Sequence, residues 1–184
     1  MLNEKAMLFT RPNPWMKPFI PEEFVKSRDT LYCLSQEGRG SATPIVTALT
    51  VAVTEAAVQW AKKCPGGRLT VPMLIELDEA ANVCRWNELP DMYSHFGSRG
   101  INVDTVFQSW SQGVARWGDA GMKKLWGAAN VAIYGGGGRE DSFLSMLSKI
   151  IGVYWQDSKQ TSRSKHGTSR SVSAQSQQRS IATI

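Results

Sequence analysis

The chain has 184 residues, which is enough for one domain with a sizeable core but hardly for two. With 42% hydrophobic and 20% charged residues, its composition is that of an ordinary soluble protein. It contains two His and three Cys residues, the latter without CxxC spacing. These numbers argue against a histidine-based metal site, a Ser-His-Asp triad, a zinc ribbon and a disulfide framework.

The excess of positive charge is confined to the C-terminal end. The chain has 21 Lys and Arg against 16 Asp and Glu, and five basic residues but no acidic one follow Asp157. The first 157 residues are therefore neutral. The basic tail could contact phosphate or anionic lipid headgroups, or it could simply be solvated. No signal peptide is visible, and Glu55 interrupts the longest apolar stretch (residues 45–61), so we expect no transmembrane segment.

The chain begins with a Pro-rich arm and continues with alternating strands and helices. Four prolines lie between residues 12 and 21, so we expect residues 1–28 to be a connecting arm without regular helix or central strand. Apolar runs predict strands at 30–35, 71–78, 101–108 and 131–134. We expect helices at 44–63, 87–96, 112–129 (interrupted near Gly118) and 141–151. This alternation predicts an α/β fold, with a mainly parallel sheet covered by helices on both faces.

The last segment, residues 158–184, is rich in Ser, Gln and basic residues. Its composition indicates disorder. However, Lys165–Thr168 separates two polar runs that alternate weakly, so a polar β-hairpin is an equal alternative. We therefore divide the chain into an arm (1–28), a main α/β segment (29–157) and a basic tail (158–184).

The predicted strand at 71–78 ends in Asp78-Glu79 and matches the Walker B element of a P-loop NTPase. Parallel sheets bind ligands at the carboxyl ends of their strands. There Asp78 could hold hydrated Mg²⁺, and Glu79 could accept a proton from the attacking water or orient it. The alternative is that the acidic pair merely starts a loop.

Gln108 ends the next predicted strand along the chain. An amide in that place could bond the γ-phosphate of a nucleotide or the water beside it. Alternatively, it could cap loop backbone. Four of the seven tryptophans crowd the middle of the chain, where packing is favoured over stacking on single-stranded bases. These four are Trp86, Trp110, Trp117 and Trp126.

Residues 77–118, LDEAANVCRWNELPDMYSHFGSRGINVDTVFQSWSQGVARWG, resemble the C-terminal region of TraG/TraD-type conjugative coupling proteins of type IV secretion systems, especially the actinobacterial ones. The DEAAN, SRGI and QSWSQG blocks, in this order, carry the resemblance, which extends over most of the chain from about residue 30.

The resemblance implies a partial RecA-like fold and a hexameric ATPase that uses ATP and Mg²⁺. Such a motor works at the cytoplasmic side of the inner membrane. It moves relaxase-bound single-stranded DNA into the secretion channel, and its partners are relaxosome and channel proteins. Asp78 and Glu79 correspond to the Walker B pair and Gln108 to the following glutamine. Arg99 lies where related motors carry an arginine that acts on the neighbouring subunit, but it is displaced by two positions and could be a surface residue.

Two departures from the family pattern affect the expected activity. No GxxxxGK[ST] phosphate loop occurs in the sequence. Gly135–Gly138 is followed by Arg-Glu, so we interpret it as a turn and not as a nucleotide site; Gly38-Arg39-Gly40 is equally weak. The family's membrane-spanning part is not present. We therefore expect a fragment, a truncated gene product or one piece of a split motor, and we expect this chain alone to bind no ATP or Mg²⁺. The alternative is a non-enzymatic docking domain for relaxosome or channel proteins.

Overall fold

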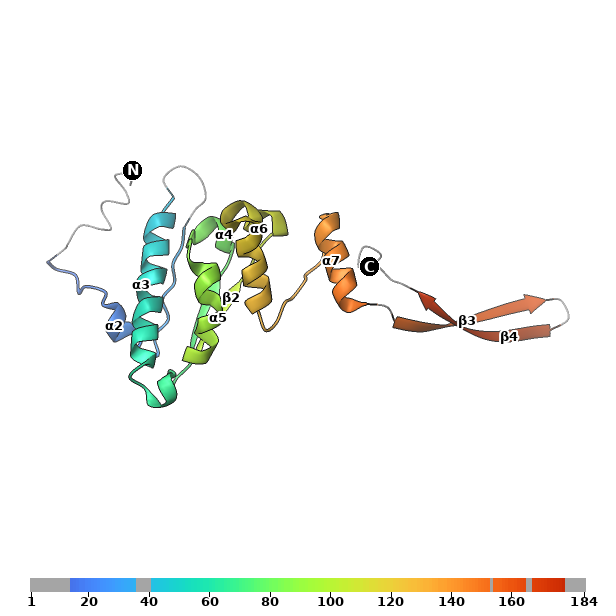
Figure 1. Ribbon diagram of the computed structural model, residues 1–184, viewed down its shortest axis with the longest axis horizontal. Coiled ribbons are helices and arrows are strands. Elements are labelled where there is room, and N and C mark those ends of the chain that lie inside the picture. The colour runs from blue at the N-terminus through green and yellow to red at the C-terminus, as the bar shows by residue number, and fades with distance from the viewer. Residues whose placement is uncertain (1–13, 36–40, 153, 165–166, 178–184) are drawn as a thin grey trace. The chain divides into compact units, whose positions relative to one another are not determined.

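The computed structural model describes residues 14–35, 41–152, 154–164 and 167–177, and Gly38-Arg39-Gly40 lies outside them. It forms two compact units, Met1–Tyr134 and Gly135–Ile184, each described here by itself. The division between the two units lies between Tyr134 and Gly135, whereas the boundary expected after residue 157 lies within β3 (Tyr154–Ser164). The first unit contains α2 (Pro21–Phe24), α3 (Thr43–Ala61), the 3-10 turn η1 (Pro65–Gly67), β1 (Met73–Leu77), α4 (Ala80–Val83), α5 (Leu89–Arg99), β2 (Ile101–Thr105) and α6 (Trp110–Ala128) (Figure 1). The second contains α7 (Asp141–Ile151), β3 (Tyr154–Ser164) and β4 (Gly167–Gln177).

The sheet of the first unit consists of β1 and β2, which pair in parallel from Met73 opposite Ile101 to Leu77 opposite Thr105. A parallel pair needs a crossover connection, and the segment containing α4 and α5 provides it. The expected α/β class with a parallel sheet is therefore confirmed, as are the two strands that carry the candidate site.

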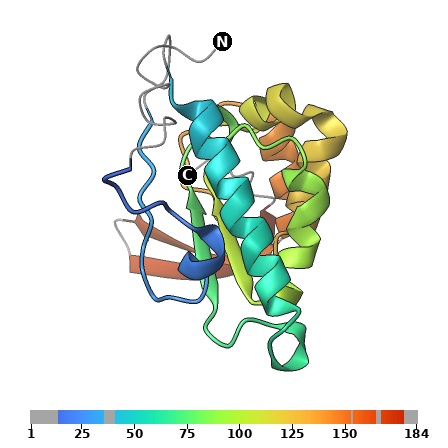
Figure 2. The ribbon, with the colours of Figure 1, turned by 90° about the vertical axis from the view of Figure 1, so that its left-hand side faces the viewer.

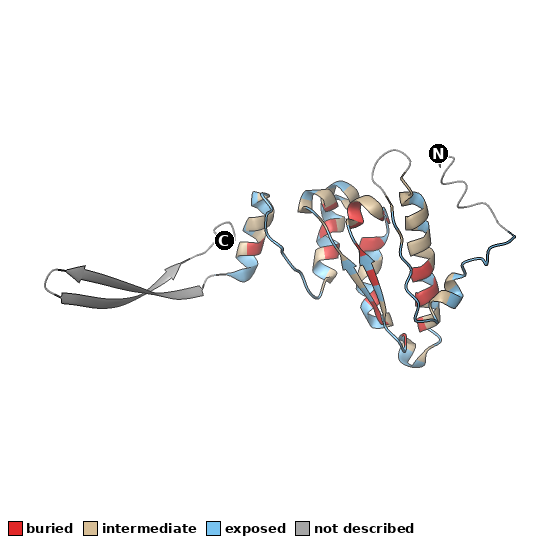
Figure 3. Cartoon of the chain, turned by 180° about the vertical axis from the view of Figure 1, so that it is seen from behind, coloured by how far each residue is buried: buried red, intermediate tan, exposed pale blue. Residues whose placement is uncertain are grey.

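The helices α3, α5 and α6 cover only one face of this sheet. Ile75, Leu77 and Ile101 are buried with residues of these three helices in a single core cluster. On the other face, Leu74 is 58% exposed and Glu76 is also exposed. The burial along β1 alternates accordingly. The expectation of helices on both faces is therefore not met in the described part of this unit. Figure 2 shows α3 crossing the sheet with α5 and α6 beside it, and Figure 3 shows the buried positions.

The core combines small and aromatic side chains. Ala57 and Ala61 of α3 are fully buried, so the helix approaches the sheet closely, and Phe96 and Leu89 of α5 are buried beside it. The expected packing role of the tryptophans is confirmed for Trp86, which is 4% exposed and lies against Phe96 at a centroid distance of 5.8 Å. The other three central tryptophans lie in ring pairs: Trp117 pairs with Phe107, and Trp110 pairs with Trp126.

Two of the four expected strands are wrong: residues 30–35 and 131–134 form no strand. Their apolar side chains are exposed, and Leu34 and Ile133 each reach 91%. A strand requires a neighbour to satisfy its backbone groups, and neither run pairs with the described strands. These two apolar runs have the composition of strands, but they form none because no described strand pairs with them.

The arm contains one short helix that the sequence did not predict. Helix α2 has Pro21 in its first turn, where the missing N–H costs nothing. Phe24 of this helix packs against Phe19 at 5.4 Å between ring centroids, and Lys26 lies 4.8 Å from the ring centroid of Trp60 on α3. The described part of the arm thus packs on α3.

Helix α3 is the one helix in the described residues that is long and apolar enough to cross a membrane. Core helices of soluble proteins can have the same length and composition; in α3, 28% of the apolar window is buried, including Val53, Ala57 and Ala61. Its bounds agree with the expected helix at 44–63, and Pro44 lies in its first turn.

The expected interruption of the helix at 112–129 is confirmed. Gly118, inside α6, has φ 71° and ψ 169°, which is not a helical conformation. This region of backbone space is essentially restricted to glycine. Ser109 caps the first half of the helix by accepting a hydrogen bond from the backbone N–H of Gln112.

In the second unit, α7 has the bounds expected from the sequence, and the tail forms a hairpin over its described part. The strands β3 and β4 pair antiparallel from Tyr154 opposite Gln177 to Ser164 opposite Gly167. Of the two alternatives for the tail, the structure therefore supports the polar hairpin. Gly135–Gly138 precede α7 as an exposed connection with a bend at Gly136, and the strand expected before them is not formed.

Candidate functional site

The candidate site lies at the carboxyl ends of β1 and β2. Backbone hydrogen bonds continue past both strands: the N–H of Val106 donates to Leu77 O (3.0 Å) and the N–H of Ala80 donates to Val106 O (3.1 Å). These bonds hold the two strand ends side by side. Asp78-Glu79 and Gln108 are therefore brought to the same edge of the sheet, as the sequence predicts.

Glu79 has an unusual backbone. Its φ of 48° and ψ of 47° place it in the left-handed region, and it is the sole residue other than glycine with positive φ in the described chain. Such a conformation costs about 1 kcal/mol or more for a residue with a Cβ. The bend lets α4 begin directly after the strand, where Asn82 and Val83 donate backbone N–H groups to Glu79 O at 2.8 and 3.0 Å. Strain at a carboxylate that follows a strand is a feature that often accompanies function.

The carboxylate of Glu79 accepts hydrogen bonds from two side-chain amides. Gln108 Nε2 donates to Glu79 Oε1, and Asn82 Nδ2 lies 3.5 Å from Oε2. Gln108 itself is held by Gln112, whose Oε1 accepts the backbone N–H of Gln108 at 3.2 Å. Glu79 is half-buried and Gln108 exposed, so the pair remains open to solvent.

Asn82 and Gln112 were not predicted from the sequence. The signal that could have identified them is their spacing. Asn82 follows Glu79 by three residues at the start of a helix, and Gln112 follows Gln108 by four, in the first turn of the next helix. A polar side chain in the first turn of a helix can reach back to the residue three or four positions before it.

Asp78 precedes Glu79 and is exposed at the end of β1. An exposed carboxylate at this position fits a hydrated Mg²⁺, which is bound through one or two carboxylates and its own water. In the described chain, no group of three or more His, Cys, Asp and Glu side chains could hold a metal ion directly. Glu76, two residues earlier, is exposed on the open face opposite Asp104 and so needs no buried partner.

Arg99 lies at the other end of the sheet, one residue before Gly100 and β2. Its Nη1 donates to Gly67 O at 3.0 Å, and Arg68 Nη1 donates to Gly97 O at 2.7 Å. The two arginines tie the turn η1 to the end of α5. Within one chain Arg99 therefore does not join Asp78, Glu79 and Gln108, and it could reach such a site only in a neighbouring subunit.

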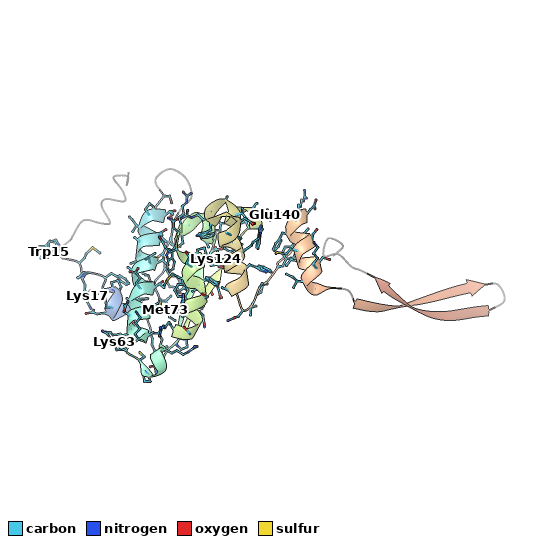
Figure 4. The ribbon with its side chains drawn as sticks, in the orientation of Figure 1. Trp15, Lys17, Lys63, Met73, Lys124 and Glu140 are labelled. Atoms are coloured by element: carbon cyan, nitrogen blue, oxygen red, sulfur yellow. The ribbon has the colours of Figure 1, made fainter. Side chains whose placement is uncertain are left out.

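A surface hollow of about 360 Å³ lies beside the start of α5 and the middle of α6. Trp117 Nε1 donates to Trp86 O at 2.7 Å, while Arg116 Nη2 donates to Arg85 O and Asn87 Oδ1. Arg116 Nε is buried without a hydrogen bond. At the rim, Lys124, labelled in Figure 4, pairs with Asp91 at 2.5 Å.

Comparison with family models agrees with the assignment that the sequence blocks suggest. A family model described as the TraM recognition site of TraD and TraG matches residues 72–184. Comparison with curated proteins gives no match. Among solved structures, the bacterial conjugative coupling protein TrwBdeltaN70 in an unbound monoclinic form is similar, with 19% identity and a TM-score of 0.46. The match covers 73% of this chain and 31% of that one, so the chain spans about a third of its length.

Proposed function

Because the chain belongs to the TraG/TraD family of conjugative coupling proteins, we propose that it carries the water-activating part of an ATP-driven DNA-transfer motor. The complete motor would be a homo-hexamer at the cytoplasmic side of the membrane. It would move relaxase-bound single-stranded DNA into a type IV secretion channel, with relaxosome and channel proteins as partners. The observation that carries the proposal is the hydrogen bond from Gln108 to Glu79 at the carboxyl ends of two adjacent parallel strands.

The residues present fit one part of a Mg-ATP site. Asp78 is exposed and can accept hydrogen bonds from metal-bound water, and Glu79 stands next to it with its carboxylate oriented. No phosphate loop of the GxxxxGK[ST] type occurs in the sequence, so the groups that would hold the phosphates have to come from elsewhere. When bound, Mg-ATP supplies the phosphoanhydride bond that is hydrolysed.

In this proposal each residue has a distinct task. Glu79 accepts a proton from the attacking water or orients it, and its task requires the carboxylate to be held in place. Gln108 and Asn82 fix that carboxylate by donating to its two oxygens. Because Gln108 is exposed, its side-chain amide can leave the carboxylate of Glu79 and bond a phosphate oxygen instead. The hydrogen-bond partner of Gln108 would then depend on whether the γ-phosphate is present.

The experiment compares ATP hydrolysis by this chain alone with hydrolysis by the same chain joined to a phosphate-loop-bearing half of a coupling protein. We expect no turnover from the chain alone and turnover from the joined protein. Glu79→Gln in the joined protein should lower turnover by about 10²–10⁴-fold while nucleotide still binds, because the substitution removes the base and keeps the shape. Unchanged turnover in this variant would assign the acidic pair to structure.

The second candidate function is docking of a relaxosome protein, and the hollow beside α5 and α6 favours it. The hollow lies within the matched region, and Arg116, Trp117 and Lys124 are among the residues that line it. Arginine and tryptophan are the side chains most enriched at the centres of protein interfaces. Loss of partner binding in Arg116→Ala, with hydrolysis by the joined protein intact, would separate docking from catalysis.

A further inference from the structure

The segments that follow Glu79 and Gln108 meet a second time, away from the candidate site. Helix α4 begins directly after Glu79 and leads into an irregular stretch before α5, while α6 begins two residues after Gln108. From α6, Arg116 donates hydrogen bonds through Nη2 to Arg85 O and to Asn87 Oδ1 in that stretch. The two segments are therefore joined at their near ends, by the bond between Gln108 and Glu79, and again farther along.

Trp117 makes another connection from the same helix. Its Nε1 donates to Trp86 O at 2.7 Å, and its ring lies edge-on against Phe107 with 5.9 Å between the ring centroids. Phe107 immediately precedes Gln108, so the Trp117 side chain contacts both the irregular stretch and the end of the second strand. Arg116 Cζ lies 5.9 Å from the ring centroid of Trp117, and a guanidinium at this distance from an indole supports its orientation.

We propose that Arg116 and Trp117 are positioning residues for the pair formed by Glu79 and Gln108. The role rests on the proposed water-activating function of Glu79. Together with the bond inside the pair, the contacts of Trp117 form a closed path. It runs from Glu79 along α4 to Trp86, across to Trp117, and back along α6 to Gln108. In a closed path the far contact restricts how the two near ends approach each other, and a general base depends on such a restricted geometry.

The first half of α6 connects the two ends of this path. Gln112 Oε1 accepts the backbone N–H of Gln108 at 3.2 Å. Arg116 follows Gln112 by four residues, which places both on the same face of the helix. The helical conformation continues to Trp117 and is interrupted at Gly118. The side chains that hold Gln108 and those that hold the irregular stretch therefore belong to one short helical piece.

Lys124 provides a matched comparison. It lines the same hollow as Arg116 and Trp117 but belongs to the second half of α6, beyond the interruption at Gly118 (Figure 4). Its partner is Asp91 in the first turn of α5, and the ion pair is exposed. If the hollow mattered only through its charge, Arg116 and Lys124 would be equivalent. The positioning role predicts an effect for Arg116 alone, because Arg116 bonds the stretch that follows α4.

The first test observes the pair by NMR in the full chain without nucleotide. We expect a contact in the parent between the side-chain amide protons of Gln108 and the Cγ protons of Glu79. Trp117→Phe removes the indole donor and keeps an aromatic ring, while Arg116→Met removes the guanidinium and keeps a long side chain. Both variants should lose the contact within the pair. Lys124→Met, the same change on the other half of α6, should retain it.

Contacts between Met73 and Ile101, which lie opposite each other at the start of the sheet, report whether the sheet remains folded. If Arg116→Met loses these contacts as well, the milder variant Trp117→Phe decides the test. Persistence of the contact within the pair in the folded variants would overturn the positioning role. Absence of that contact in the parent would overturn it too.

The second test measures ATP hydrolysis by the joined protein. Trp117→Phe and Arg116→Met should each lower kcat by about 10–10²-fold while the KM for ATP stays close to that of the parent. The reason is that a misplaced base impairs the chemical step and leaves the phosphate-binding groups unchanged. Lys124→Met should keep the kcat of the parent.

The outcomes separate the positioning role from the proposed function. Normal kcat in Arg116→Met and Trp117→Phe, in a protein that Glu79→Gln inactivates, would overturn the positioning role alone. Normal kcat in Glu79→Gln would instead overturn the proposed function. If the hollow serves only docking, Arg116→Ala loses partner binding with hydrolysis intact, and this result would also overturn the positioning role.

Discussion

The side-chain amide of Gln108 donates a hydrogen bond to the carboxylate of Glu79, although 29 residues separate them in the chain. The bond joins the ends of two adjacent parallel strands and depends on both the strand pairing and the backbone of Glu79. Glu79 adopts the left-handed region at the end of β1, and its carboxylate meets the amide of Gln108 there. The conformation of one residue therefore determines the geometry of the candidate site.

The first prediction concerns the cost of this conformation. Replacing Glu79 by Gly or by Ala removes the same carboxylate and the same hydrogen bonds, but Gly adopts a φ of 48° without strain. We expect the Glu79→Gly variant to be more stable than Glu79→Ala by about 1 kcal/mol. The measurement is the free energy of unfolding in urea. Equal stabilities, or a more stable alanine variant, would show that the left-handed conformation is not strained.

Sequence reasoning located this site because the chemistry of parallel sheets is regular. The residues that follow two apolar strands meet at one edge whenever the strands are neighbours, so Asp78, Glu79 and Gln108 could be grouped without a structure. The left-handed turn of Glu79 could not be predicted, since it depends on how α4 packs after the strand. Gln112 was missed although its spacing of four residues from Gln108 is a usable signal, because it accepts a backbone N–H, which every residue type except proline presents.

The fold was predicted less completely where tertiary partners decide the outcome. The runs 30–35 and 131–134 have strand composition, but strand formation requires a neighbour and neither run has one among the described strands. In the tail, by contrast, composition and alternation of residues predict different structures. Its Ser, Gln and basic residues indicate disorder, whereas the alternation of faces indicates the hairpin that the structure contains.

The second prediction uses two glycines of α6 that both have free space around a Cβ. Gly127 is helical, so Gly127→Ala should raise the free energy of unfolding by about 0.5 kcal/mol. Gly118 has φ 71° and ψ 169°, so Gly118→Ala should lower it by about 1–3 kcal/mol for backbone reasons alone. Chemical denaturation of the two variants gives both values. A stabilising Gly118→Ala would imply that the helix can continue through this position.

The third prediction concerns pH. Burial raises the pKa of the Cys84 thiol above its ordinary value of 9.0, although hydrogen bonds with Thr50 and Thr47 act in the other direction. In the unfolded chain the thiol ionises first, so above its unfolded pKa the unfolded state holds fewer protons. The contribution of Cys84 to stability is therefore fully present below about pH 9 and is lost as the pH rises through the folded pKa.

The stability of the parent should accordingly fall more steeply above pH 9 than that of Cys84→Ala, although the variant is less stable at neutral pH because it leaves a cavity. Urea unfolding at a series of pH values measures the difference. Parallel pH curves for the parent and Cys84→Ala would contradict the prediction.

The last prediction tests whether Arg99 acts within its own chain. Its guanidinium donates to Gly67 O at 3.0 Å, and Arg99 is half-buried at the end of α5. Truncation leaves this carbonyl without its partner and frees the glycine turn, so Arg99→Ala should lower the free energy of unfolding by about 1 kcal/mol. The control is Lys123→Ala, which removes an exposed ion pair with Asp119 and should change stability by less than about 0.5 kcal/mol. If Arg99→Ala leaves stability unchanged, the contact with Gly67 is dispensable. The arginine is then free to act on a neighbouring subunit, and the same variant should reduce hydrolysis by the joined protein. A destabilised variant with normal hydrolysis would instead assign Arg99 to the turn between α3 and β1.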